Sequence, residues 1–133
     1  MRVGLIISGS LETISGSHLY ARRLVGHLRS CCDSVEVFSL PQHQYARQLA
    51  SNFTHDLERR VPAAQLDLLL QDEACHPALL LLNRQLRGRV SFPIVSLVHR
   101  LRGSEPHAPG AQEFYGRVER QYLTSVDAFV CGS

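Results

Sequence analysis

Short apolar segments recur along the chain at regular intervals. Residues 2–8 (RVGLIIS) form a nearly continuous apolar run that stops at Gly9, which is typical of a strand buried on both faces. Similar segments, rich in Val, Leu, Ile and Phe, are residues 35–40, 65–71, 93–99 and 126–131. Each is bounded by turn-forming or polar residues, so the pattern predicts five strands.

Segments with helical spacing of apolar residues separate most of these strands. They span residues 17–30, 77–87 and 111–125. The side chains expected to face the core from these helices are Leu19, Leu24, Val25, Leu28, Leu79, Leu80, Leu82, Leu86, Phe114, Val118, Tyr122 and Leu123. Residues 42–60 are polar and predict helix or partly irregular structure, and residues 100–110 hold two prolines and two glycines and predict a loop.

Strands that alternate with helices predict an α/β fold, a Rossmann-like doubly wound parallel sheet of about five strands with helices on both faces. No repeat, low-complexity tract or linker divides residues 1–133, so we expect a single domain. The common strand order 3-2-1-4-5 is the order we expect. In that order the first and fourth strands are neighbours, and a ligand crevice opens where their connections diverge.

Polar residues and glycines follow the predicted strands at the edge where parallel strands end together. Gly9 follows the first strand, Asp72 and Glu73 follow the third, and His99 ends the fourth. The expected order therefore places the loop from Gly9 to Gly16 beside His99.

Composition favours a soluble globular protein. Of the 133 residues 44% are hydrophobic and 20% are charged, and the net charge of +2 is too small to indicate a nucleic-acid or membrane partner. The apolar runs are too short for a membrane span or a signal peptide, so we expect a cytoplasmic protein. Its four cysteines have no C-x-x-C spacing and are expected to be reduced, mostly buried thiols.

All fourteen basic residues are arginines. The absence of lysine from this sequence excludes a Schiff-base mechanism and the lysine-dependent phosphate loop. His76, His107 and the other histidines lack the spacing of metal ligands, so we expect no metal.

The glycine loop leaves two interpretations open. Gly9 and Gly16 are too far apart for a G-x-G-x-x-G fingerprint, and the second strand ends without an acid for a ribose hydroxyl. The functional interpretation is a loop in which Gly9, Ser10, Gly16 and Ser17 bring the backbone close to a bulky polar ligand, before a helix N-terminus that favours anions. The alternative is that both glycines only form turns.

Each remaining candidate also has a structural alternative. His99 could donate a hydrogen bond to a substrate or act as a general base, or it could only cap or pack. Asp72 and Glu73 could bind sugar hydroxyls or cap the helix before Pro77. Arg100 and Arg102 could contact a phosphate or carboxylate, or simply lie at the surface.

Several stretches resemble one known family. They are MRVGLII, the loop from Gly9 to Gly16 with SGSHLYARRLVGHL, LDLLLQDEACHPALLLLNRQL, PIVSLVHRLRGSE and VERQYLTSVDAFVCGS. In this order and spacing they resemble the N-terminal domain of a GT-B fold glycosyltransferase, most similar to glycosyltransferase family 4. The resemblance runs over nearly the whole chain.

The resemblance implies a retaining transfer of a sugar from a nucleotide-sugar donor, such as a UDP- or GDP-sugar, to a sugar, lipid or small-molecule acceptor, without a metal or other cofactor. It implies that Gly9, Gly16 and their neighbours reach toward the donor phosphates and that His99 contacts the donor sugar as the catalytic residue. Family members often have paired glycines at the second site, where this chain has Gly16 followed by Ser17.

We expect this chain to be the acceptor-binding half of such an enzyme and to be inactive alone. The family's C-terminal domain, which binds most of the nucleotide, is expected to be missing or to come from a partner chain. An exposed sheet edge would then favour self-association. The alternatives are a non-catalytic α/β binding or scaffold module and a flavodoxin-like or other nucleotide-binding domain.

Overall fold

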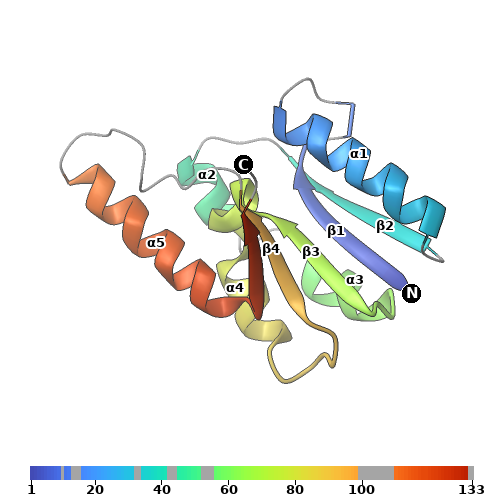
Figure 1. Ribbon diagram of the computed structural model, residues 1–133. Coiled ribbons are helices and arrows are strands. Elements are labelled where there is room, and N and C mark those ends of the chain that lie inside the picture. The colour runs from blue at the N-terminus through green and yellow to red at the C-terminus, as the bar shows by residue number, and fades with distance from the viewer. Residues whose placement is uncertain are drawn as a thin grey trace.

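Five parallel strands form one sheet in the order β2-β1-β3-β4-β5 (Figure 1). The computed structural model describes residues 1–9, 11–12, 16–31, 34–41, 45–51, 56–98 and 110–131. Its elements are β1 (Arg2–Ser8), α1 (Gly16–Cys31), β2 (Ser34–Leu40), α2 (Tyr45–Ala50), α3 (Leu57–Ala63), β3 (Leu68–Asp72), the 3₁₀ helix η2 (Glu73–Cys75), α4 (His76–Leu86), β4 (Ile94–Val98), α5 (Ala111–Ser125) and β5 (Ala128–Cys131). The expected Rossmann-like doubly wound parallel sheet is confirmed.

The expected strand order 3-2-1-4-5 is wrong in one respect. The third strand does not extend the sheet beyond β2 but pairs with the other side of β1, where Leu5 lies opposite Leu70. Burial explains this placement, because Leu69 to Asp72 are all buried whereas exposed and covered residues alternate along most of β2. A strand covered on both faces belongs inside the sheet, and a half-exposed strand such as β2 suits its edge.

Two hydrophobic cores lie on opposite faces of the sheet. Val3, Leu5 and Ile7 of β1 pack with Ala21 and Val25 of α1. On the other face the core draws its buried side chains from α3, α4 and α5, as well as from the strands. Figure 1 shows α1 on one side and the neighbouring helices α4 and α5 on the other.

Two aspartates secure the amino ends of the strands. Asp67 accepts a hydrogen bond from the backbone N–H of Arg2 through Oδ2 (2.7 Å), and its own N–H donates to the carbonyl of Arg2 (2.7 Å). Asp127 makes the same pair of bonds with Ile94, both 2.8 Å long. Each aspartate therefore fixes the register of one parallel strand pair at its start.

The helices present most of the expected residues to the core. Val25, Leu79, Leu82, Leu86, Val118 and Tyr122 are buried, and Leu24, Leu28, Leu80 and Leu123 are partly buried against the core. Leu19 and Phe114 were expected to face inward, but they are 42% and 49% exposed. Both lie near the start of a helix at the carboxyl edge of the sheet, where the strands end and no longer cover the first turns.

The described cysteines differ in exposure. Cys75 is buried, whereas Cys31 and Cys131 are exposed, so the expectation of mostly buried thiols is wrong for the described cysteines.

The edge strand β5 exposes Phe129 and Val130 by half or more. Self-association through this edge stays a prediction. Within the described ranges, every helix is too short or too polar to cross a membrane.

Candidate functional site

The connections that follow β1 and β3 diverge to opposite faces of the sheet. The two strands are neighbours, but the chain leaves β1 toward α1 on one face and leaves β3 toward η2 and α4 on the other. In doubly wound sheets ligands bind where connections diverge in this way. This rule marks the ends of β1 and β3, at Gly9 and Asp72, as the expected ligand position. The expectation that the first and fourth strands are neighbours is wrong, because β3 lies between β1 and β4.

Gly9 turns the chain at the end of β1. Its φ of +75° lies in the left-handed region, which glycine enters without steric cost. Its backbone N–H donates a 2.7 Å hydrogen bond to the carbonyl of Leu40 at the end of β2. The glycine therefore turns the chain out of the sheet while its N–H still bonds the end of β1 to the end of β2.

The chain then enters α1, whose sixteen residues begin at Gly16. Ser17 lies in the first turn, which contains no acidic residue, and Arg29 lies in the last turn. The first backbone N–H groups of a helix have no intrahelical acceptor, and the helix dipole adds partial positive charge there. This end of α1 is thus suited to an anion, and no carboxylate in its first turn opposes one.

Asp72 and Glu73 are drawn into the protein. Asp72 is 5% exposed, and its Oδ1 accepts a 3.0 Å hydrogen bond from the N–H of Ala74, so it caps η2. Glu73 is 3% exposed. Asp72 is therefore a helix-capping residue, as one of the two interpretations of the sequence expected. The helix that it caps is the short η2, which precedes α4.

The remaining predicted site residues lie outside the described part of the chain. These are Ser10, His99, Arg100 and Arg102. Their expected roles stay predictions.

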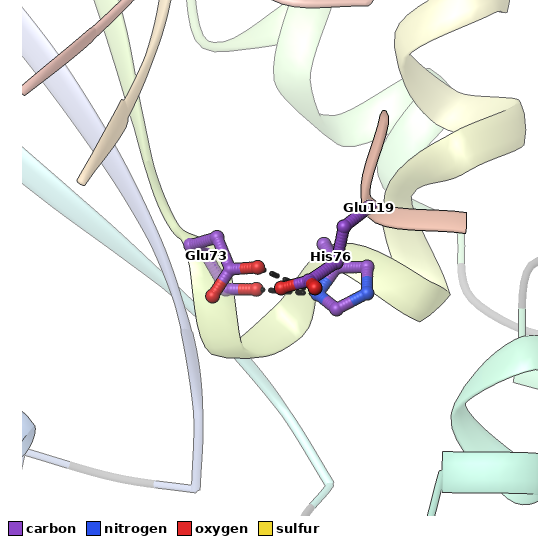
Figure 2. A group of neighbouring side chains, drawn as sticks. All are labelled: Glu73, His76 and Glu119. Carbon is purple, nitrogen blue, oxygen red and sulfur yellow. Dashed lines mark hydrogen bonds and ion pairs between the residues drawn. The ribbon is translucent and has the colours of Figure 1, made fainter. Parts of the chain in front are cut away.

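Glu73 belongs to a buried cluster that the sequence analysis missed (Figure 2). Nδ1 of His76 lies 2.9 Å from the carbonyl oxygen of Glu73 and 3.1 Å from its Oε1. Glu119 reaches the same place from α5, and one ligand atom from each of the three side chains lies within 4.8 Å of the others. His76 and Glu119 are 2% and 3% exposed.

A network of uncharged polar groups lies between the sheet and α4 and α5. The hydroxyl of Tyr122 lies 2.8 Å from Oγ of Ser96 and 3.1 Å from Oε1 of Gln71. Gln71 and Asn83 exchange two amide hydrogen bonds of 2.6 and 3.1 Å, and Asn83 also donates to Oγ of Ser125 (3.0 Å). The ring of Tyr122 packs 5.6 Å from that of His76, so this network adjoins the Glu73, His76 and Glu119 cluster.

Two ionisable groups here are held in their neutral forms. Burial raises the pKa of the Cys75 thiol well above its ordinary value, and the negative charges of Asp72 and Glu73 add to the effect. Burial likewise raises the pKa of the Tyr122 hydroxyl, partly offset by its hydrogen bond to Ser96. Cys75 is therefore not a nucleophile in the folded protein.

No local signal could have found the cluster. Glu73 and His76 are close in sequence, but Glu119 is brought to them only by the packing of α5 against α4. A hollow of about 370 Å³ lies at the opposite end of the sheet, lined by Arg87, Phe92, Ile94 and Asp127 among others. It is remote from the carboxyl ends of β1 and β3, because these residues precede β4 and β5 or begin β4.

The chain was compared with protein families, curated proteins and solved structures. No family model matches, and no curated protein matches. Among solved structures, the S. aureus MnaA–UDP co-structure aligns with a TM-score of 0.59 at 13% sequence identity. The alignment covers 98% of this chain and 37% of that protein, so the chain spans little more than a third of its length. At this identity the similarity shows a shared Rossmann-like fold.

Proposed function

We propose that the chain is the acceptor-side domain of a retaining glycosyltransferase of the family 4 type, which moves a sugar from a nucleotide-sugar donor to an acceptor. The observation that carries this proposal is the divergence of the chain after the neighbouring strands β1 and β3, with Gly9 ending β1 at a positive φ and α1 following it. The structural similarity to a UDP-bound protein supports a nucleotide-sugar as the ligand.

In this proposal the first turn of α1 and the glycine loop face the diphosphate of the donor. When the glycosidic bond to the nucleotide breaks, negative charge builds up on the leaving phosphate. Backbone N–H groups that are already oriented toward that charge lower the barrier without a metal ion. Arg100 and Arg102 supplement these donors, and Ser10 and Ser17 offer hydroxyls to the phosphates.

His99 contacts the donor sugar in the same proposal, and the acidic rim at Asp72 and Glu73 lies on the acceptor side. Asp72 would act there by holding the chain after β3 in place, because its side chain caps η2. The remaining nucleotide contacts come from a second domain, so the chain alone is inactive.

The test combines binding with complementation. UDP- and GDP-sugars are titrated into the chain by calorimetry, and transfer is then assayed after a donor-binding domain is supplied. We expect weak binding alone, transfer on complementation, and loss of transfer in His99→Ala. The matched control is His27→Ala, which changes an exposed histidine on α1.

Transfer that survives His99→Ala would remove His99 from the site. Binding without transfer under any complementation would favour the non-catalytic binding or scaffold module instead.

The strand order favours a second candidate function. The order 2-1-3-4-5 is that of flavodoxin-like sheets, which bind a flavin nucleotide at the β1/β3 crevice. Adding FMN to the chain and following its fluorescence separates the two candidates, because a flavin site binds FMN more tightly than UDP. Saturable binding of UDP with none of FMN supports the glycosyltransferase.

A further inference from the structure

We propose that Glu73, His76 and Glu119 bind one divalent transition-metal cation, of the zinc or manganese class, which fastens α5 to the corner between β3 and α4. The cation would be structural, and the proposed sugar transfer uses no metal. The two proposals share Glu73, but metal binding is measured without any sugar transfer.

The donor atoms suit such a cation. An imidazole nitrogen with carboxylate oxygens is a donor set that zinc and manganese accept, whereas magnesium and calcium favour oxygen alone. The carbonyl oxygen of Glu73 offers a fourth donor, because it lies 2.9 Å from Nδ1 of His76. Figure 2 shows the carboxylates of Glu73 and Glu119 turned toward the same edge of the His76 ring.

The distances need only a small adjustment. Ligands bonded to zinc at roughly 2.0–2.2 Å lie about 3.4 Å from one another in a tetrahedral site. Nδ1 of His76 and Oε1 of Glu73 are already 3.1 Å apart. The three ligand atoms all lie within 4.8 Å of one another, and binding would draw them closer.

Charge and burial favour a cation at this place. Two glutamates that are each 3% exposed lie together with a third buried carboxylate, Asp72, nearby. Buried carboxylates are stable only when their charge is compensated or removed by protonation. A divalent cation at this place would compensate two negative charges.

A cation at this site would stabilise the packing of α5 against the end of β3 and the start of α4. Glu73 and His76 lie at the end of β3 and the start of α4, and Glu119 lies midway along α5. A cation held by both parts links α5 to the rim at the end of β3.

The test is metal binding by the purified chain after treatment with EDTA and removal of the chelator. One equivalent of Zn²⁺ should bind per chain, measured by elemental analysis after desalting. Zinc at about one hundred times its Kd should raise Tm by roughly 5–10 °C, and Mg²⁺ at the same concentration should leave Tm unchanged.

Glu119→Gln removes one ligand and should weaken zinc binding at least tenfold while leaving a folded chain. The matched control is Glu113→Gln, which changes a glutamate on the same helix that is paired with Arg117 at the surface. It should bind zinc like the unchanged chain. Because the seven histidines of the chain could bind zinc elsewhere, equal affinity in Glu119→Gln and Glu113→Gln overturns the proposal. A chain that retains no metal and shows no change in Tm with Zn²⁺ or Mn²⁺ overturns it as well.

Discussion

The N–H of Gly9 donates a 2.7 Å hydrogen bond to the carbonyl of Leu40, which joins the end of β1 to the end of β2 at the carboxyl edge of the sheet. Gly9 makes this bond with a φ of +75°. The first turn of the proposed ligand loop is thus fixed by a backbone bond and by a conformation that favours glycine. The loop starts from a defined position at the edge of the sheet.

Gly9→Ala should destabilise the fold by about 1 kcal/mol, since a side chain at this φ contacts its own backbone. The measurement is urea unfolding followed by circular dichroism. Gly26→Ala is the control, because Gly26 lies within α1 with nothing within 4 Å of an added Cβ. That change should stabilise the chain by about 0.5–1 kcal/mol. Equal effects of the two substitutions would contradict the strained turn at Gly9.

Tyr122→Phe should cost about 1–3 kcal/mol, because it removes the hydroxyl between Ser96 and Gln71 in a buried place. A double-mutant cycle with Ser96→Ala isolates the contact. The two substitutions should be coupled by about 0.5 kcal/mol or more, and additive effects would show that the 2.8 Å contact contributes little.

Stability should fall as the pH rises above about 9. The folded chain holds Cys75 and Tyr122 protonated through burial, which raises both pKa values, while the unfolded chain ionises them at their ordinary values. The stabilising effect is complete at neutral pH and is lost with increasing pH, first as the unfolded state ionises Cys75 and then as it ionises Tyr122. Unfolding free energies at pH 7, 9 and 10.5 test this, and Cys75→Ala should flatten the first part of the decline.

Gly4→Val should destabilise the fold by about 2 kcal/mol through overpacking. A Cβ at Gly4 would lie 2.5 Å from Cδ1 of Leu66 and 3.2 Å from side-chain atoms of Leu69 and Phe38. The change adds Cβ and two methyl groups to this filled space in the sheet. Thermal unfolding gives the value, and an unchanged Tm would mean that this side of the core is loosely packed.

The sequence predicted the elements well because each has a strong local signal. Residues 2–8 and 111–125 agree with β1 and α5 residue for residue, since one is a continuous apolar run ended by glycine and the other has a clear helical face. The polar segment 42–60 has no such periodicity. The short helix α2 lies within it, and α3 begins in it and continues to Ala63.

The strand order and the buried cluster could not be obtained in the same way. Strand order depends on which strands are covered on both faces. The one sequence signal for it is that β3 (LLLQD) begins with three consecutive leucines, whereas β2 (SVEVFSL) alternates polar and apolar residues. The cluster depends on the packing of α5, which brings Glu119 to His76 without any sequence motif. The turn at Gly9 could be predicted, because a glycine directly after a buried strand is a local signal for a turn.

The central claim is that the carboxyl ends of β1 and β3 receive the diphosphate of a nucleotide-sugar. Titration of UDP into the ¹⁵N-labelled chain, followed by two-dimensional NMR, tests it most directly. Saturable shifts with a Kd in the millimolar range, about −4 kcal/mol, are predicted for the amides of Gly9, Gly16, Ser17 and Asp72. Shifts centred on Phe92 and Ile94 at the opposite end of the sheet, or no saturable shifts at all, would contradict the claim.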